Sequence, residues 1–242
     1  MISDEDLSKF IENSISDYHK KILDKLLTLK LNKVLKRKNP YLFKVKGLNS
    51  SQDLIESILD AHLSSQEEAI FGGVLEELAI FVCGKVYGGV KSAAEGIDLE
   101  FEKNDIKYIV SIKSGPHWGN ANSIKKLKDH FKKAKRILGT NAAKKNVVAI
   151  NGCCYGQDRN PDKGEYLKLC GLTFWEYISG DVEMYSKIIE PLGLDAQNRN
   201  DAFNIEYEKV LERFIAEFTN DFCNELGEIE WDKLLEYNSG NK

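Results

Sequence analysis

The sequence lacks long hydrophobic runs and a signal for export. None of its 242 residues lies in a stretch of 18 consecutive apolar residues, so no transmembrane helix is expected. The first six residues, Met1–Asp6, are acidic and are not the basic segment that precedes the apolar core of a secretory signal. We therefore expect a soluble protein that is located in the cytoplasm and does not act at a membrane.

Proline, glycine and cysteine are also sparse. Four Pro and 18 Gly are too few for a collagen-like or disordered chain, and 42% hydrophobic residues are typical of a globular protein. The number of cysteines is odd and no CxxC pair occurs, so neither disulfides nor a structural zinc site is expected. We interpret all five cysteines as small buried residues: Cys83, Cys153, Cys154, Cys170 and Cys223.

Charge is distributed unevenly along the chain, although the net charge is only -4. Residues 103–146 contain twelve Lys or Arg and two Asp or Glu, a local charge of about +10. Residues 181–242 contain fifteen acidic and six basic residues, a local charge of about -9. Such asymmetry favours a surface that binds a polyanion, but solvated helix faces would give the same pattern.

Helical periodicity dominates the first part of the chain. Apolar residues recur at three- and four-residue steps over 3–38, and Pro40 is expected to stop that helix. Residues 41–45 are predicted to form a short extended link. Two further helices are predicted over 51–64 and 65–86, the second opened by a capping-box sequence.

At residue 97 the spacing of apolar residues changes from the helical pattern to an alternation with a period of two residues. A hairpin is expected first, with strands over 97–102 and 106–113 joined by a turn over 103–105. A loop over 114–120 and a basic helix over 123–138 follow. The later segments are a buried strand over 147–154, an apolar strand or helix start over 172–178, and helices over 182–238. This order predicts an α/β fold in which a small central mixed β-sheet is flanked by helices, with helical N- and C-terminal segments.

The predicted hairpin carries residues suited to phosphodiester hydrolysis. Pairing across its turn places Asp98 opposite Ser111 and Glu100 opposite Ile109, and these residues share one face with Lys113. Carboxylates bind Mg²⁺, and a nearby lysine stabilises the attacking hydroxide or the transition state. The alternative is an exposed hairpin face with an ordinary scatter of charge.

The same residues carry a resemblance to a known family. Gly96-Ile97-Asp98 and Ser111-Ile112-Lys113 resemble the PD-(D/E)xK nuclease motif, with Ile97 in place of proline. The longer string, from Val110 to Asn120 and on into the Lys-rich helix, resembles type II restriction endonucleases of the PmeII-like group. The resemblance implies one nuclease domain over 1–242, with a restriction-endonuclease-like core at 39–195 between a helical N-terminal extension (1–38) and C-terminal helices (196–242).

The resemblance also implies a set of catalytic and metal-binding residues. Asp98 would bind Mg²⁺ together with the backbone carbonyl of Ile112. The catalytic residues would be Asp98, Lys113, Ser111 and Glu76. A glutamate from the helix before the hairpin would be a further ligand. Helical geometry does not choose between Glu76 and Glu77, and similarity to related nucleases favours Glu76.

One position departs from the motif. Ser111 stands where the motif has Asp or Glu, and a serine cannot replace a carboxylate as a charged ligand. Two residues are candidates for the missing acid, namely Asp129 on the basic helix and Glu100 on the face of Asp98. This departure is also the reason to consider a DNA-binding protein with an inactive nuclease centre.

The basic helix and the loop before it are the candidate DNA-binding residues. A helix beside the site would supply phosphate contacts, which give affinity without reading sequence. The candidates are Lys125, Lys126, Lys128, Lys132 and Lys133 on the helix and His117 and Asn120 in the loop. Trp118 is interpreted as a packing anchor.

The resulting hypothesis is a Mg²⁺-dependent type II restriction endonuclease that cleaves double-stranded DNA at a short specific site. Its expected partners are a second copy of the chain, since a palindrome needs two sites, and a cognate DNA methyltransferase. The alternatives are a structure-specific or repair nuclease of the same fold and a catalytically dead DNA-binding protein.

Overall fold

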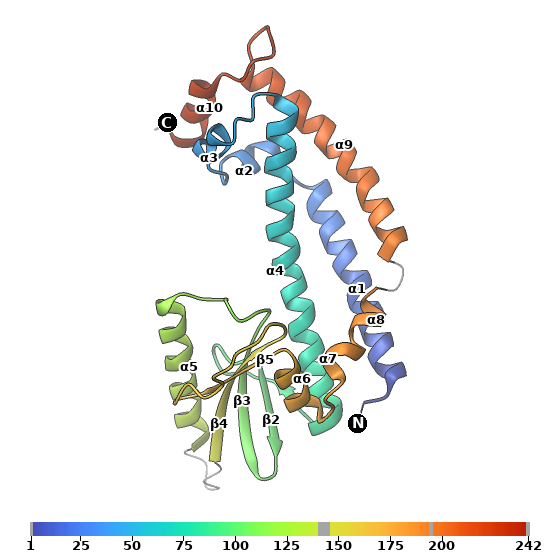
Figure 1. Cartoon of the computed structure of the whole chain (residues 1–242), viewed down its shortest axis with the longest axis vertical. Coiled ribbons are helices and arrows are strands. Elements are labelled where there is room, and N and C mark those ends of the chain that lie inside the picture. The colour runs from blue at the N-terminus through green and yellow to red at the C-terminus, as the bar shows by residue number, and fades with distance from the viewer. Residues whose placement is uncertain (1, 140–145, 194–195, 241–242) are drawn as a thin grey trace. The chain divides into compact units, whose positions relative to one another are not determined.

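The chain forms two compact units in the computed structural model, which describes residues 2–139, 146–193 and 196–240 (Figure 1). The sheet unit consists of Met1–Ser16 and Phe71–Leu194, and the helical unit consists of Asp17–Ile70 and Asp195–Lys242. No helix in the described ranges combines the length and apolar character needed to cross a bilayer.

The limits expected within the chain, at residues 38 and 195, stay predictions. Helices α1 (Asp4–Leu27) and α4 (Ser51–Tyr87) each contribute residues to both units. That the chain is one nuclease domain stays a prediction.

The sheet unit is built on a five-stranded sheet, and its mixed character agrees with the sequence prediction. Its strands are β1 (Val90–Lys91), β2 (Leu99–Lys103), β3 (Ile106–Lys113), β4 (Asn146–Cys153) and β5 (Leu167–Cys170), and they are ordered β1-β2-β3-β4-β5. The β1–β2 and β2–β3 pairs are antiparallel, and the β3–β4 and β4–β5 pairs are parallel. Strands β1 and β5 are too short to give a periodic signal and were not expected.

Helices cover both faces of this sheet (Figure 1). Helix α5 (Ala121–Gly139) packs Leu127 and Phe131 against Ile109 and other residues of one face. On the other face, residues such as Val110 pack against α6 (Leu172–Ser179), the ends of α1 and α4 that belong to this unit, and the short helices α7 (Met184–Lys187) and α8 (Ile189–Leu192). The segment 172–178, which the sequence left open, is therefore helical.

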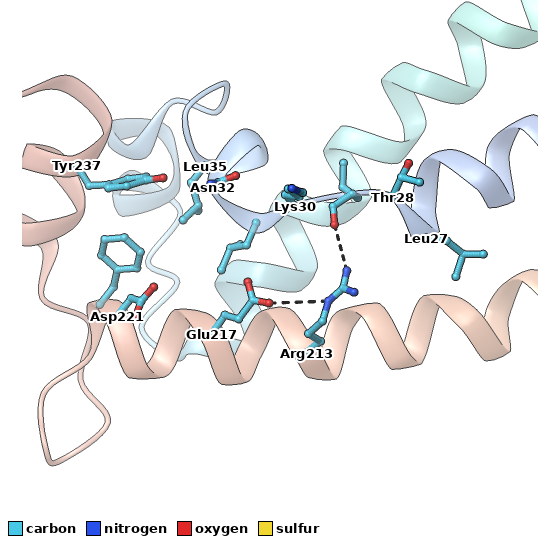
Figure 2. A pocket seen from close by; sticks show the side chains of 12 residues that line it. Leu27, Thr28, Lys30, Asn32, Leu35, Arg213, Glu217, Asp221 and Tyr237 are labelled. Atoms are coloured by element: carbon cyan, nitrogen blue, oxygen red, sulfur yellow. Dashed lines mark hydrogen bonds and ion pairs between the residues drawn. The ribbon is translucent and has the colours of Figure 1, made fainter.

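The helical unit has a hydrophobic core of its own. It contains α2 (Leu31–Leu35), α3 (Pro40–Val45), α9 (Ala196–Phe222), α10 (Trp231–Ser239) and parts of α1 and α4. A pocket of about 610 Å³ opens in this unit, where Arg213 donates to the carbonyl oxygen of Leu29 (3.1 Å) and lies 3.9 Å from a carboxylate oxygen of Glu217 (Figure 2). The first of these contacts ties α9 to the segment between α1 and α2.

Three predictions about the N-terminal helices were wrong. The single helix expected over 3–38 is divided into α1 (Asp4–Leu27) and α2 (Leu31–Leu35). Residues 51–87 form one continuous helix, within which the Ser65 hydroxyl donates to the Ala61 carbonyl (3.0 Å) instead of capping a new helix. Residues 41–45 are helical, because Asn39 caps the backbone N–H groups of Tyr41 and Leu42 and Pro40 occupies the first turn. Pro40 therefore opens a helix instead of ending one.

The cysteines are placed largely as expected. All five are free thiols, and four of them are buried: Cys83, Cys153, Cys154 and Cys170. Cys223 is only half-buried, which corrects the expectation for that residue.

Candidate active site

A tight hairpin brings the candidate catalytic residues together. Asn104 and Asp105 form its two-residue turn with positive φ values of 52° and 60°, a conformation that Asn and Asp tolerate. Strand pairing places Glu100 opposite Ile109, as the sequence predicted. Because side chains alternate along strands, the register puts Asp98, Ser111 and Lys113 on the same face.

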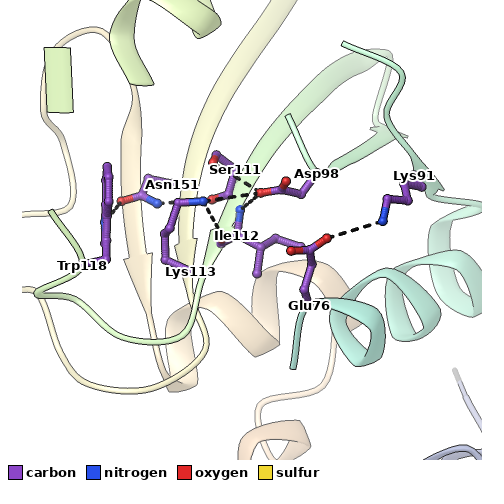
Figure 3. Close-up of polar contacts among 8 residues, drawn as sticks. All are labelled: Glu76, Lys91, Asp98, Ser111, Ile112, Lys113, Trp118 and Asn151. Atoms are coloured by element: carbon purple, nitrogen blue, oxygen red, sulfur yellow. Dashed lines mark hydrogen bonds and ion pairs between the residues drawn. The ribbon is translucent and has the colours of Figure 1, made fainter. Parts of the chain in front are cut away.

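Asp98 is anchored at the start of this hairpin. Its Oδ2 atom accepts hydrogen bonds from the backbone N–H of Ile112 (2.6 Å) and from the Ser111 hydroxyl (3.3 Å). The Nζ atom of Lys113 donates to the Ile112 carbonyl oxygen (2.8 Å) and lies 3.7 Å from the same Asp98 oxygen (Figure 3). A carboxylate, a backbone carbonyl and an ammonium group therefore meet at the end of β3.

Glu76 reaches this place from α4, whereas Glu77 does not. The Glu77 side chain is exposed, but that of Glu76 is half-buried and points toward the Asp98 region (Figure 3). Burial is the main cause that raises the pKa of Glu76, and the negative charge of Asp98 raises it further. Lys91 of β1, whose Nζ lies 3.7 Å from Glu76 Oε1, acts against this rise, as does Lys113.

The donors at this site fit a magnesium ion. Glu76 and Asp98 supply two carboxylates that repel each other, and Ile112 supplies a carbonyl oxygen. The described residues contain no group of three His, Cys, Asp or Glu side chains placed to hold a metal. Mg²⁺ does not require one, because it commonly keeps several waters and binds one or two carboxylates.

Comparison with known protein families gives independent evidence about the family to which the chain belongs. A family model described as type II restriction endonuclease EcoO109I matches residues 5–200, which is most of the chain. The chain belongs to this restriction endonuclease family. Its enzymes are nucleases that act on DNA, and the mixed sheet flanked by helices agrees with the fold expected for them. No curated protein matched the chain, and the likeness to the PmeII-like group stays a prediction.

The two acids proposed to replace the one missing at Ser111 differ in their surroundings. Glu100 shares the strand face of Asp98, but it accepts from Ser92 (2.5 Å) and pairs with Lys107 (2.9 Å). Burial acts to raise the pKa of Glu100, yet these two partners hold it below its ordinary value. Asp129 is exposed on α5, two residues from the buried Leu127 and Phe131 and so on the opposite side of the helix.

Ser111 itself is buried beside Asp98. Its side chain is 2% exposed and its hydroxyl donates to Asp98, so it supports the carboxylate. A second carboxylate near Asp98, that of Glu76, comes from α4.

Sequence reasoning missed a buried asparagine that orients the loop after Lys113. Asn151 of β4 is fully buried, and its amide donates to the Ser111 carbonyl oxygen (3.2 Å) and accepts from the indole N–H of Trp118 (3.0 Å). The Trp118 ring lies 5.7 Å from Lys113 Nζ, a cation–π distance (Figure 3). The available signal was a polar residue inside an otherwise apolar strand.

A glycine and a histidine fix the chain just before Asp98. Gly96 has a φ of 73°, and the His130 ring of α5 occupies the space that a Cβ at this position would need. A side chain at Gly96 would therefore displace the histidine. Sequence reasoning did not single out His130, because contacts between α5 and this turn are set by tertiary packing.

The candidate DNA-binding lysines differ in their surroundings. Lys125 and Lys126 are exposed, whereas Lys128 and Lys132 pair with Glu165 at 3.0 and 2.8 Å, and Lys133 pairs with Glu95 at 3.2 Å. Part of the positive charge of α5 is thus balanced within the unit.

The two loop candidates also differ from each other. His117 is exposed in the loop before α5. Asn120 caps that helix, because its Oδ1 accepts from the backbone N–H and the hydroxyl of Ser123 at 3.1 and 3.2 Å. Any contact of Asn120 with DNA would therefore have to coexist with the cap.

Replacing Glu76 with glutamine should separate cleavage from stability. We expect the Mg²⁺-dependent cleavage rate to fall by roughly 10²-fold or more, because a neutral amide is a poorer ligand for the ion. Without Mg²⁺ we expect the substitution to raise the melting temperature at neutral pH. A carboxyl with a raised folded pKa stabilises at low pH, and this contribution is lost as the pH rises above the ordinary value of 4.5.

Glu77→Gln is the matched control, because it removes the same charge from the exposed neighbouring position. Single-turnover cleavage and thermal melting at several pH values measure both effects. A larger loss of cleavage in Glu77→Gln than in Glu76→Gln would contradict the placement of the site.

Proposed function

We propose that this endonuclease hydrolyses phosphodiester bonds of double-stranded DNA at a short specific site and requires Mg²⁺. The observation that carries the proposal is the meeting of Lys113, Asp98 and Glu76 at the end of the hairpin, where two carboxylates repel each other in the absence of a cation. The chain belongs to a type II restriction endonuclease family, whose reaction is one that two carboxylates and a lysine can catalyse with a bound metal ion.

Each residue at the site has a distinct role in this proposal. Asp98, Glu76 and the Ile112 carbonyl would hold Mg²⁺. When bound, the ion neutralises charge on the phosphate and lowers the pKa of water. Lys113 would orient the attacking water in line with the leaving oxygen and stabilise the charge that develops on the phosphate. Ser111 and the Ile112 N–H fix the Asp98 carboxylate, so that it stays oriented throughout the reaction.

Helix α5 would bind the DNA backbone. The pairs of Lys128, Lys132 and Lys133 with glutamates lie at the surface, where such pairs contribute about 0–1 kcal/mol, so phosphates can replace the carboxylates. Lys125 and Lys126 would contact phosphate directly, and His117 and Asn120 would contact DNA from the loop. Contacts of this kind set affinity and position, and do not read sequence.

The partners follow from the proposed reaction. Cleavage of both strands at a palindromic site requires two active sites, so we propose a homodimer. An enzyme that cuts a short sequence would also cut the genome of its own cell, so we propose a cognate DNA methyltransferase as its genetic partner. Both would act in the cytoplasm.

A digest of long unmethylated phage DNA tests the function directly. With Mg²⁺ we expect discrete bands, whose sizes begin to define the site, and with EDTA we expect intact DNA. A smear would indicate a nuclease without sequence preference. Intact DNA in every lane, for several DNAs, would contradict the proposal and favour a DNA-binding protein with an inactive centre or a nuclease specific for another DNA structure.

A further inference from the structure

The loop that follows β4 lies directly beside the lysine of the active site. The backbone N–H of Cys154 donates to the Lys113 carbonyl oxygen (2.9 Å), and the N–H of Tyr155 donates to that of Ser114 (3.0 Å). The Tyr155 ring packs against Gly115, where it fills the space that a Cβ would need. Backbone hydrogen bonds therefore hold the start of this loop close in space to Lys113.

The same loop is built to keep its shape. The Asp158 carboxylate pairs with Lys163 (3.0 Å) and Lys168 (3.4 Å) and accepts from the backbone N–H of Asn160 (3.0 Å). Lys168 also donates to the Pro116 carbonyl oxygen (2.9 Å), which ties the loop after β4 to the loop after β3. Fixing both loops before DNA binds lowers the entropy cost of recognition.

This rigid support presents side chains suited to reading bases. Gln157 and Arg159 are exposed on either side of the anchored Asp158, and no hydrogen bond or ion pair engages their side chains within the described chain. Arginine can contact guanine O6 and N7 together, and glutamine can contact adenine N6 and N7 together. The lysines of α5 differ in kind, because point charges on a helix are suited to phosphates.

A hollow next to the site supports this arrangement. It has a volume of about 750 Å³, and its lining includes Gln157, Arg159 and, from the helix turn just before Glu76, Leu75. The two polar side chains thus border a hollow that also contacts Cys154, whose N–H donates to the Lys113 carbonyl oxygen, and apolar side chains such as Trp175 line much of the rest.

We propose that the segment Tyr155–Asn160 is a base-reading loop, in which Arg159 and Gln157 contact base edges of the recognition sequence. The inference rests on the proposed function and deepens it, because it assigns part of the sequence preference to named side chains. Asp158 acts as a positioning residue, and the lysines of α5 give affinity for any sequence.

Cleavage of a randomised pool of synthetic duplexes tests the inference. Sequencing the ends made by the wild-type chain with Mg²⁺ gives its preferred site. We expect Arg159→Ala to lose discrimination by roughly 5- to 150-fold at one base pair of each half-site and to keep the rest of the preference. Arg159→Lys should behave likewise, because it keeps the charge and loses the two-pronged contact. Gln157→Ala should relax a different position.

Two controls make the outcome unambiguous. Arg37→Ala removes an exposed arginine from the helical unit and should leave the sequence preference unchanged. In a Lys113→Ala background, binding to preferred and altered duplexes measures base reading without the chemical step. An unchanged preference in the Arg159 variants, or an equal loss on all sequences, would overturn the inference while leaving the proposed function intact. A wild-type chain that cuts without preference would overturn both.

Discussion

Replacing Asp98 with asparagine is expected to lower the rate of Mg²⁺-dependent DNA cleavage by about 10³-fold or more while leaving the fold intact. The amide keeps an oxygen that can accept from the Ile112 N–H, which the Asp98 carboxylate binds at 2.6 Å. It loses the negative charge that would hold the ion. Stabilisation by a bound metal contributes several kcal/mol to the transition state, and each 1.4 kcal/mol changes a rate by about tenfold.

Single-turnover cleavage over a range of Mg²⁺ concentrations measures this effect, and circular dichroism reports the fold. We also expect a higher Mg²⁺ concentration for half-maximal rate, because a ligand has been weakened. Asp105→Asn is the matched control, since Asp105 is exposed in the turn of the same hairpin and asparagine tolerates its positive φ. A wild-type rate in Asp98→Asn would remove Asp98 from the proposed site.

Replacing Lys113 with methionine is expected to lower the cleavage rate by roughly 10²- to 10³-fold through a different route. Methionine keeps an unbranched apolar side chain beside the Trp118 ring but removes the ammonium group that lies near Asp98 and the Ile112 carbonyl. Because lysine is not a metal ligand, the Mg²⁺ concentration for half-maximal rate should change little. DNA binding at equilibrium should also persist, since the lost interaction acts mainly in the transition state.

Lys103→Met provides the comparison on the same hairpin, where the lysine lies over the Tyr87 and Tyr177 rings and away from the carboxylates of the site. It should cleave at close to the wild-type rate. If Lys113→Met altered only the Mg²⁺ requirement, with the maximal rate unchanged, the proposed role in stabilising charge on the phosphate would be wrong.

The two acids considered for the missing position show why local patterns are not enough to assign ligands. Alternation along a strand correctly put Glu100 on the face of Asp98, but it could not show that Ser92 and Lys107 already bind the Glu100 carboxylate. Likewise, the sequence correctly placed Asp129 on the basic helix that follows the hairpin. It could not show that burial of Leu127 and Phe131 turns Asp129 outward. Availability of a carboxylate depends on neighbours that are distant in sequence.

The helical segments also show that a local sequence pattern does not determine the structure. The Ser65 motif has the sequence of a capping box, yet its hydroxyl bonds to a carbonyl within α4 and the helix continues. A short pattern of this kind is compatible with either outcome, since serine side chains bond to backbone groups in both. Packing of the flanking turns into two different cores selects the continuous helix.

The hairpin, its register and the shared face of Asp98, Ser111 and Lys113 could all be predicted from the amino-acid sequence alone. These features follow from alternation with a period of two and from a turn whose residues tolerate positive φ, both of which are local. The sequence segments around the hairpin also predicted a type II restriction endonuclease, and this prediction agrees with the family that matches the chain.

Long-range packing sets which glutamate of α4 faces Asp98 and which polar residue of β4 supports the loop after Lys113. Glu76 and Glu77 are equivalent on a helical wheel, and the approach of α4 to the end of the sheet distinguishes them. Asn151 and the loop carrying Arg159 likewise gain their positions from strands and loops that are far apart along the chain. The physical reason is that periodicity records which face of an element is buried, whereas the identity of the neighbours on that face is set by long-range packing.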